Sequence, residues 1–453
     1  MKIHDRRPGP THGPDHPETL VQQLLTQYRR DGLPIDVDFR EMVKLVGSPD
    51  RYTHLLHPYP AKLLQHIPYL FLNSSSFGRV GGTVLDPFSG SGTVLLEALL
   101  AGWNAVGVDS NPLASLISRV KISTPLERHL DEGAEKILSF WNEDPKCPPP
   151  AIQNLEYWFY PHIVDGLARI RSGIDRLTNL EVSEFYKLCL SVTVRKVSLA
   201  NPRFAVPVRL RPENYPRGHW YRAKAEQRLH FLQQVSPLKV FEEVVETNRK
   251  RIARIRGALG GIGYVQNIDF RNVSKIHLGQ ADAIITSPPY AGAQKYIRSS
   301  GLELGWLEGV SQSELSSLRG STIGREKFSR TEYRELKPCG VESADLLLES
   351  VKRRNALRAC IAATYIREMR SALSVAKEHL YSGGDLLLVV GPTTVSGEVF
   401  DVPSYLDRIL VHELGFNKRL ELVDRIRTRK LTTKRNSSSS MIAKEHVVWY
   451  QKN

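Results

Sequence analysis

The chain has 453 residues, of which 41% are hydrophobic and 24% are charged, and it contains 32 glycines and 27 prolines. This is ordinary globular usage, which excludes a collagen-like or wholly disordered chain. The 62 Lys and Arg residues outnumber the 48 Asp and Glu residues, for a formal net charge of +14. Such a surface attracts polyanions, nucleic acid first among them, although a generally basic enzyme is an equal alternative.

Neither the apolar runs nor the cysteines point to a membrane or to metal. No run approaches the roughly 20 apolar residues of a membrane-spanning helix. The first residues, MKIHDRRPGP, lack the apolar core of a secretory signal, so we expect a cytoplasmic protein. The four cysteines form no CxxC pair and have no histidine at metal-ligand spacing, which predicts neither a zinc site nor a disulfide framework.

The first elements in chain order form a strand, turn, helix and strand. Residues 1–50 are expected to be an N-terminal arm followed by a helix near residues 20–30. From residue 83, the apolar run TVLDPF, the turn SGSGT, the helical pattern VLLEALLAG and the second apolar run NAVGVDSNP follow one another. Such a unit makes a right-handed crossover in a parallel sheet, and ligands bind beyond the carboxyl ends of its strands. Residues 51–125 are therefore expected to hold a ligand.

The rest of the chain is predicted to interrupt and then complete this sheet. Residues 126–260 have a mainly helical pattern with many Arg and Lys residues in their second half, and a second basic insertion spans residues 311–354. Strands are predicted at 264–269, 281–286 and 385–390, the last after a helix at 365–380, and a terminal hairpin at 420–426 and 446–450. The expected fold is α/β: a doubly wound, Rossmann-like sheet with a terminal antiparallel hairpin and a mainly helical insertion.

The turn DPFSGSGT spans residues 86–93 and is the first candidate binding motif. Gly90 and Gly92 permit a tight turn and a close approach of the backbone to a ligand. The run lacks the third glycine of the dinucleotide fingerprint and the Lys of the P-loop, so it fits neither phosphate motif. Asp109, about 20 residues on, can bind ribose hydroxyls or else cap the helix that begins near Pro112. Asp86 suits an ammonium group.

The second motif is TSPPY, residues 286–290, at the end of the strand ADAII. Two prolines end strand pairing and hold the neighbouring backbone rigid. Ser287 then offers a hydroxyl, Pro288 a free carbonyl and Tyr290 a flat ring, which together suit the exocyclic amine of a flipped nucleobase. A simple strand-ending Pro-Pro turn is the alternative, and the expected place beside the Gly-rich turn disfavours it.

With both motifs in hand, the sequence resembles the S-adenosylmethionine-dependent DNA amino-methyltransferases, which methylate cytosine N4 or adenine N6. The resemblance covers residues 50–125 and 260–450, and not the helical insertion. It implies S-adenosylmethionine as cofactor. The residues that it implies near the methionine half are Asp86, Phe88, Gly90 and Gly92, with Asp109 at the ribose and Asp269, at the end of the third strand, at the adenine.

The segment HPYPAKL, residues 57–63, resembles the part of the family that closes over the methionine end, with Tyr59, Pro60 and Lys62 as candidates. Its alternative is a Pro-rich lead-in to a helix at 63–72. The catalytic residues that the resemblance implies are Ser287, Pro288, Pro289 and Tyr290, with no metal.

The resemblance also implies double-stranded DNA as partner, target recognition in residues 126–260 and a catalytic half in residues 261–453. Tyr296 and Arg298 are expected near the base or its phosphate, with packing of a surface helix as the equal alternative. The basic loop at 425–435 is a second candidate for backbone contact. A cognate restriction endonuclease and the oligomeric state are left open.

Rival functions differ in their requirements. Carbon-5 cytosine methylation needs a cysteine nucleophile, and Cys339 lies in a polar insertion instead of at a strand end, so we reject it. Ser287 favours cytosine N4 over adenine N6, which stays open. An RNA amino-methyltransferase would carry an added RNA-binding module, and none is apparent. A DNA-binding or regulatory protein that keeps the cofactor fold without turnover is the rival of another class.

Overall fold

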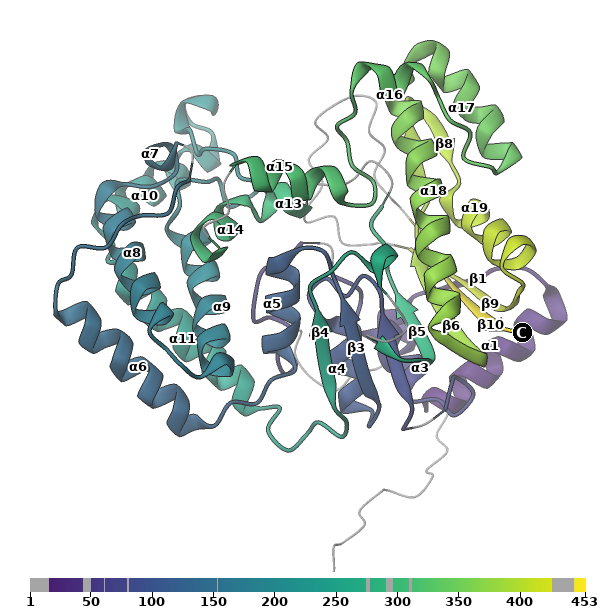
Figure 1. Ribbon diagram of the computed structural model, residues 1–453, viewed down its shortest axis with the longest axis horizontal. Coiled ribbons are helices and arrows are strands. Elements are labelled where there is room, and N and C mark those ends of the chain that lie inside the picture. Colours follow the sequence, from purple (N-terminus) through teal and green to yellow (C-terminus); the bar gives the residue numbers. More distant parts are fainter. Residues whose placement is uncertain are drawn as a thin grey trace, which may run out of the picture.

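The computed structural model describes residues 16–43, 50–60, 62–79, 81–152, 154–273, 278–290, 296–308, 312–425 and 444–453. Its centre is a single eight-stranded sheet with the order β1-β9-β10-β6-β5-β2-β3-β4 (Figure 1). The strands are β1 (Ile35–Val37), β2 (Thr83–Asp86), β3 (Asn104–Val108), β4 (Gly263–Gln266), β5 (Ala281–Thr286), β6 (Leu380–Val390), β9 (Phe416–Arg425) and β10 (Lys444–Lys452). β7 (Thr393–Val395) and β8 (Glu398–Phe400) form a separate hairpin.

The strand pairing confirms the predicted α/β class. β2 pairs in parallel with β3 and β5, and β5 in parallel with β6, whereas β10 is antiparallel to both β6 and β9. The terminal hairpin is therefore β9 with β10. The short strand β1, which no sequence pattern predicted, pairs in parallel with β9 and so joins the N-terminal segment to the sheet.

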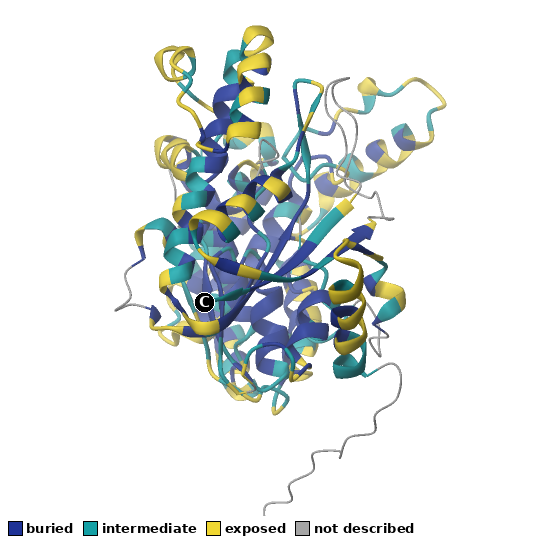
Figure 2. Cartoon of the chain, turned by 90° about the vertical axis from the view of Figure 1, so that its right-hand side faces the viewer, coloured by how far each residue is buried: buried dark blue, intermediate teal, exposed yellow. Residues whose placement is uncertain are grey.

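Apolar side chains on both faces bury the sheet. Val84 and Leu85, neighbours on β2, belong to separate hydrophobic clusters, and Ala283 and Ile284 on β5 do the same. Successive strand residues point to opposite faces, so continuous apolar runs are what a sheet covered on both sides requires. Figure 2 shows the strands inside and the exposed surfaces on the outer faces of helices.

Helices cover the two faces of the sheet. One face packs against α1 (Pro17–Asp31), α2 (Phe39–Met42), α3 (His66–Leu72) and α4 (Thr93–Leu100). The other face packs against α18 (Ala356–Glu378) and α19 (Val402–Arg408), the latter followed by a π-helical turn at Ile409–Glu413.

The predicted helical insertion is a separate lobe beside the sheet (Figure 1). It is built on α9 (Leu180–Val197), against which α8 (Pro161–Asp175), α11 (Pro237–Ala253) and also α5 (Pro112–Lys121) pack. Its other helices are α6 (Glu127–Asn142), α7 (Leu155–Trp158), α10 (Trp220–Gln234) and the 3-10 turn Pro212–Asn214. α14 (Gly301–Glu308), which follows TSPPY and α13 (Tyr296–Ser299), packs on α9 as well. The part of the chain that follows TSPPY thus continues into this lobe.

A second group of helices stands at the opposite end of the sheet, above α18 (Figure 1). It comprises α16 (Arg330–Arg334) and α17 (Glu342–Arg354), while α15 (Gln312–Ser321) lies between the two lobes. Within the part of the chain that is described, no helix has the length and apolar character needed to span a membrane.

Several predicted boundaries were wrong. The strand predicted at 385–390 begins at Leu380, and the one predicted from residue 420 begins at Phe416. The third strand was expected to reach Asp269, but β4 ends at Gln266 and Asp269 instead caps the 3-10 turn Phe270–Asn272, because its side chain accepts a hydrogen bond from the Arg271 amide at 3.0 Å. The helix expected at 365–380 begins nine residues earlier, at Ala356. There the Asn355 side chain accepts from the Arg358 amide and starts it.

Candidate active site

The Gly-rich turn joins β2 to α4 at the carboxyl edge of the sheet. Gly90 and Gly92 both have left-handed backbones, with φ of 51° and 72°. They serve different purposes. A Cβ on Gly92 would lie 2.9 Å from the Ser118 hydroxyl oxygen, so Gly92 permits α4 and α5 to pack closely. Gly90 lines the pocket described below, and Gly92 does not.

Asp109 holds this turn in place. It follows β3 directly, and its carboxylate accepts the Gly90 amide at 2.9 Å and the Asn111 amide at 2.8 Å. Burial raises its pKa to about 6, against these two hydrogen bonds, which lower it. The capping of α5, which the sequence left as an alternative role for Asp109, belongs to Asn111, whose side chain accepts the Leu113 amide at 3.1 Å.

The two motifs meet through Asp86. β2 and β5 are adjacent, and the Asp86 carboxylate accepts the Thr286 hydroxyl at 2.8 Å and the Phe88 amide at 3.2 Å. Burial is the largest influence on this group and raises its pKa to about 7. Asp86 is therefore a buried link between the Gly-rich turn and TSPPY, and it is not among the pocket-lining residues.

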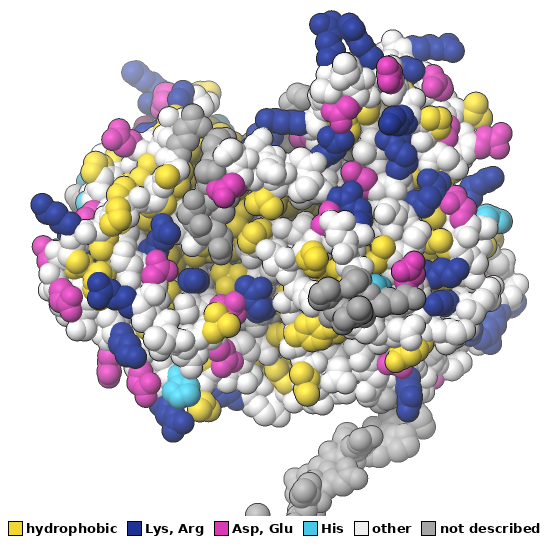
Figure 3. Space-filling view, in the orientation of Figure 1, with side chains coloured by type: hydrophobic (Ala, Val, Ile, Leu, Met, Phe, Trp, Pro, Cys, Tyr) yellow, Lys and Arg dark blue, Asp and Glu magenta, His cyan; other side chains and the backbone are white. Residues whose placement is uncertain are grey.

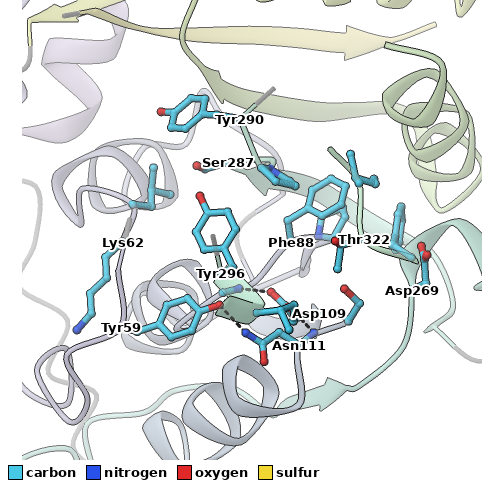
Figure 4. Close-up of a pocket in the computed structure, with 18 of the residues that line it drawn as sticks. Tyr59, Lys62, Phe88, Asp109, Asn111, Asp269, Ser287, Tyr290, Tyr296 and Thr322 are labelled. Atoms are coloured by element: carbon cyan, nitrogen blue, oxygen red, sulfur yellow. Dashed lines mark hydrogen bonds between the residues drawn. The ribbon is translucent and has the colours of Figure 1, made fainter. Parts of the chain in front are cut away.

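A single pocket opens between these turns (Figure 4). It collects side chains from segments that lie far apart in the sequence. The predicted residues that line it are Tyr59, Lys62, Phe88, Gly90, Asp109, Asp269, Ser287, Pro289, Tyr290 and Tyr296. The predicted residues that do not line it are Pro60, Asp86, Gly92, Pro288 and Arg298.

Aromatic rings and an ion pair form one end of the pocket. The rings of Phe88 and Phe270 meet edge to face with their centroids 6.3 Å apart. Beside them, the Asp269 carboxylate is paired with the Arg271 guanidinium, whose Nε lies 3.0 Å from one carboxylate oxygen. Asp269, which the resemblance places at the adenine, therefore has a cationic partner within its own turn.

The segment at 57–63 closes another side of the pocket. Tyr59 is buried, and its hydroxyl accepts from the Asn111 side-chain amide at 3.0 Å. The Lys62 ammonium donates to the backbone carbonyls of His54 and His57 at 2.9 and 2.7 Å, and burial lowers its pKa to about 8. The Asn111 bond ties this segment to the loop after β3, and the Lys62 bonds brace the segment internally.

TSPPY forms the opposite wall. Ser287 and Pro289 face the pocket, as does Tyr290, whose hydroxyl donates to the Glu445 carboxylate at the start of β10. Burial, followed by the nearby Glu445 charge, raises the pKa of Tyr290 well above its usual value. Tyr296 stands between this wall and Asp109 (Figure 4), and burial raises its pKa to about 12.

Comparison with known proteins agrees with this arrangement. A family model described as DNA methylase matches residues 46–118, which contain the segment at 57–63, the Gly-rich turn and Asp109. The Type II methyltransferase M.MvaI of Kocuria varians is 24% identical over 287 residues, or 56% of this chain and 58% of that protein. The Type II methyltransferase M.BsoBI of Geobacillus stearothermophilus is 24% identical over 280 residues, or 57% of this chain and 53% of that protein.

The chain is similar to the S-adenosylmethionine-dependent DNA amino-methyltransferases. A third relative, the Type II methyltransferase M.MjaII of Methanocaldococcus jannaschii, is 29% identical over 129 residues, 27% of this chain and 23% of that protein. The chain thus matches between about a quarter and little more than half of the length of these curated relatives.

This similarity implies S-adenosylmethionine as the methyl donor, and the pocket fits that molecule. A cationic ligand suits the negative charge of Asp109, ribose hydroxyls suit the same carboxylate, and a flat adenine suits the rings of Phe88 and Phe270. A Cβ on Gly90 would make only ordinary van der Waals contacts, 3.9 Å from the Phe88 carbonyl oxygen and the Tyr59 ring, so no protein atom crowds the turn there.

Several residues that line this pocket were missed by sequence reasoning. They are Leu63, Pro87, Ser110, Asn111, Phe270, Ile297, Thr322, Ile323 and Glu445. Some are neighbours of predicted residues, so their position along the chain could have identified them. Thr322, Ile323 and Glu445 have no local motif and reach the pocket only because distant segments fold over it.

Proposed function

We propose that the protein is a DNA methyltransferase that transfers a methyl group from S-adenosylmethionine to the exocyclic amine of a flipped base, with cytosine N4 as the favoured acceptor. The observation that carries this proposal is the hydrogen bond between Asp86 and Thr286, because it ties the cofactor turn to TSPPY at one pocket. A methyl donor and a base held there would face each other.

We assign the cofactor to the side of the pocket that Tyr59, Phe88, Gly90 and Asp109 form. S-adenosylmethionine supplies a methyl group that is already activated by its sulfonium. The protein therefore has to position the partners and exclude water, and proximity with correct orientation can contribute about 7 kcal/mol or more. The rigid bonds of Asp109 to Gly90 and Asn111 provide this fixed geometry.

We assign the flipped base to the side that Ser287, Pro289 and Tyr290 form. The Ser287 hydroxyl can accept a hydrogen bond from the amine, and the Tyr290 ring offers a face on which the base stacks. Pro288 is buried beside the pocket, so its contribution in this proposal is to fix the backbone that presents Ser287.

DNA as the partner is supported by the charge of the helical lobe. Between residues 195 and 228 the chain has nine Lys and Arg residues and two Asp and Glu residues. Trp220 is 60% exposed, with the Arg203 guanidinium 5.5 Å and the Lys224 ammonium 5.3 Å from its ring centroid. Cations beside an exposed aromatic ring suit phosphates and bases, so we propose target recognition within residues 126–260.

The shape of the molecule is consistent with a duplex over the pocket. Figure 3 shows a hollow between the two lobes, with Lys and Arg side chains on both. α17 ends in Lys352, Arg353 and Arg354 on the lobe opposite the helical insertion. A polyanion lying across both lobes would pass over the pocket between them.

Nucleoside mass spectrometry tests the function directly. Unmethylated DNA incubated with the protein and S-adenosylmethionine is expected to contain N4-methyldeoxycytidine. N6-methyldeoxyadenosine instead would keep the enzyme class and overturn the cytosine assignment, which is supported by Ser287 in the first position of the motif. Methylation of RNA alone would overturn DNA as the substrate.

A variant of Tyr290 and the wild type together distinguish two hypotheses, an enzyme and a regulatory protein that only binds the cofactor. Tyr290→Ala is expected to bind S-adenosylhomocysteine as the wild type does, because the ring lies on the base side, and to transfer little methyl. Wild-type binding of the cofactor without any methyl transfer to DNA or RNA would favour the regulatory alternative.

A further inference from the structure

Glu445 is a carboxylate in the pocket that neither sequence motif includes. The strand register explains how it arrives there. Thr286 on β5 is level with Leu388 on β6, which is level with Val448 on β10. β10 is antiparallel to β6, so Glu445, three residues before Val448, lies about 10 Å further toward the carboxyl edge of the sheet. That is the level of the two prolines and Tyr290.

Its contacts place Glu445 on the base side. One carboxylate oxygen accepts the Tyr290 hydroxyl, and the residue lines the pocket together with Ser287 and Pro289. Among the described residues, no Lys or Arg forms an ion pair with it. Its neighbour across the ladder is another carboxylate, Asp424, which lies 3.7 Å from Arg40. The negative charge of Glu445 therefore remains available to a molecule in the pocket.

Methyl transfer to an amine on the base side of the pocket requires a group that stabilises positive charge on the nitrogen. An exocyclic amine carries two hydrogens, and as its nitrogen attacks a methyl group it develops positive charge. Ser287 is a neutral acceptor, whereas hydrogen bonds to an ionised group are roughly twice as strong. A fixed carboxylate beside the nitrogen stabilises the developing charge, which is usually the largest single contribution to catalysis.

We propose that Glu445 is a base-contacting residue that accepts a hydrogen bond from the amine and then takes its proton. This rests on the proposed function. The nitrogen lone pair forms the new N–C bond while the S–C bond breaks and its electron pair stays on sulfur. The nitrogen, now positively charged, gives one proton to the Glu445 carboxylate, which later releases it to water. The Tyr290 hydroxyl holds the carboxylate in position.

The alternative is that Glu445 only orients the Tyr290 ring, and single-turnover methylation of DNA distinguishes the two. Glu445→Gln keeps the shape but cannot take a proton, and we expect it to be about 100-fold slower. Tyr290→Phe keeps both the ring and Glu445, and its loss should be less than about tenfold, the cost of one hydrogen bond. A Tyr290→Phe loss as large as that of Glu445→Gln would overturn the proposal.

Chemical rescue gives a readout that an orienting role would not produce. Glu445→Ala leaves space for a small carboxylate, so added formate should restore part of the rate, whereas Glu445→Gln should not respond. S-adenosylhomocysteine affinity by calorimetry should stay within about threefold of wild type in each variant, because Glu445 lies away from Asp109. Failure of formate to raise the Glu445→Ala rate contradicts proton transfer to Glu445.

A matched control and the wild type complete the experiment. Glu413→Gln removes a surface carboxylate that pairs with Arg370 at 2.8 Å, and its rate should equal that of wild type. An active wild type with an unaffected Glu445→Gln would refute only the role of Glu445. A wild type that methylates no DNA would refute the proposed function and this inference with it.

Discussion

Replacement of Asp109 by Asn is the sharpest test of the cofactor side. The substitution keeps the size of the side chain and removes its charge. Asp109 accepts one backbone amide with each carboxylate oxygen, Gly90 at 2.9 Å and Asn111 at 2.8 Å. An Asn side chain has one oxygen only. In either orientation its amino group faces a backbone N–H, so one donor of the turn loses its acceptor.

The structure sets the size of the effect. A hydrogen bond to a charged group contributes about 1.5–3 kcal/mol. The hydrogen bonds that the ligand hydroxyls would donate to Asp109 become weaker as well, because the charge of the acceptor is lost. The affinity for S-adenosylmethionine should therefore fall roughly 10- to 100-fold. Global stability should change little, because a buried carboxylate whose pKa is raised by burial is costly in its charged form.

Isothermal titration calorimetry with S-adenosylhomocysteine measures this loss without turnover. Ser115→Ala is the matched control, since its hydroxyl donates to the Asp109 backbone carbonyl at 3.0 Å but does not line the pocket. We expect the control to stay within about threefold of wild type. An Asp109→Asn protein that binds as tightly as the control would refute the assignment of the ribose side.

Three further predictions concern pH, packing and DNA. The pKa of Asp109 is about 6, and a cationic ligand favours its ionised form, so cofactor affinity should rise with pH through this value and level off above it. A flat calorimetric profile between about pH 5.5 and 8 contradicts this. Gly92→Ala should lower the free energy of unfolding by about 2–4 kcal/mol, because of its positive φ and the contact with Ser118. Gly415 has a φ of 70° and no atom within 4 Å of an added Cβ, so Gly415→Ala should lose only about 1 kcal/mol in denaturant titrations. Trp220→Ala should weaken DNA binding about tenfold, as fluorescence anisotropy can measure. The control Lys250→Ala changes a residue that pairs with Glu246 on α11 and should bind DNA like wild type. A wild-type affinity that is insensitive to salt between about 50 and 200 mM would refute electrostatic binding of DNA by this lobe.

The Gly-rich turn and TSPPY could be identified from the sequence because each encodes its own geometry within eight residues. Glycine permits the left-handed turn after β2, and two prolines end β5, whatever the rest of the chain does. Short continuous apolar runs then identified β2, β3 and β5, and the long helical pattern identified the insertion. These features depend on local backbone preferences, which a short stretch of residues determines.

The pairing of distant segments was decided only by the tertiary structure. Glu445 lies 155 residues from Tyr290 in sequence, and no pattern near it indicates a pocket. Likewise, Gly92 matches the cofactor motif but permits close packing on Ser118, and Asp269 is paired with Arg271 beyond the end of its strand. Which side chains share a pocket depends on sheet order and on the packing of many side chains at once, so local preferences determine the strands and turns while cooperative packing determines which of them meet.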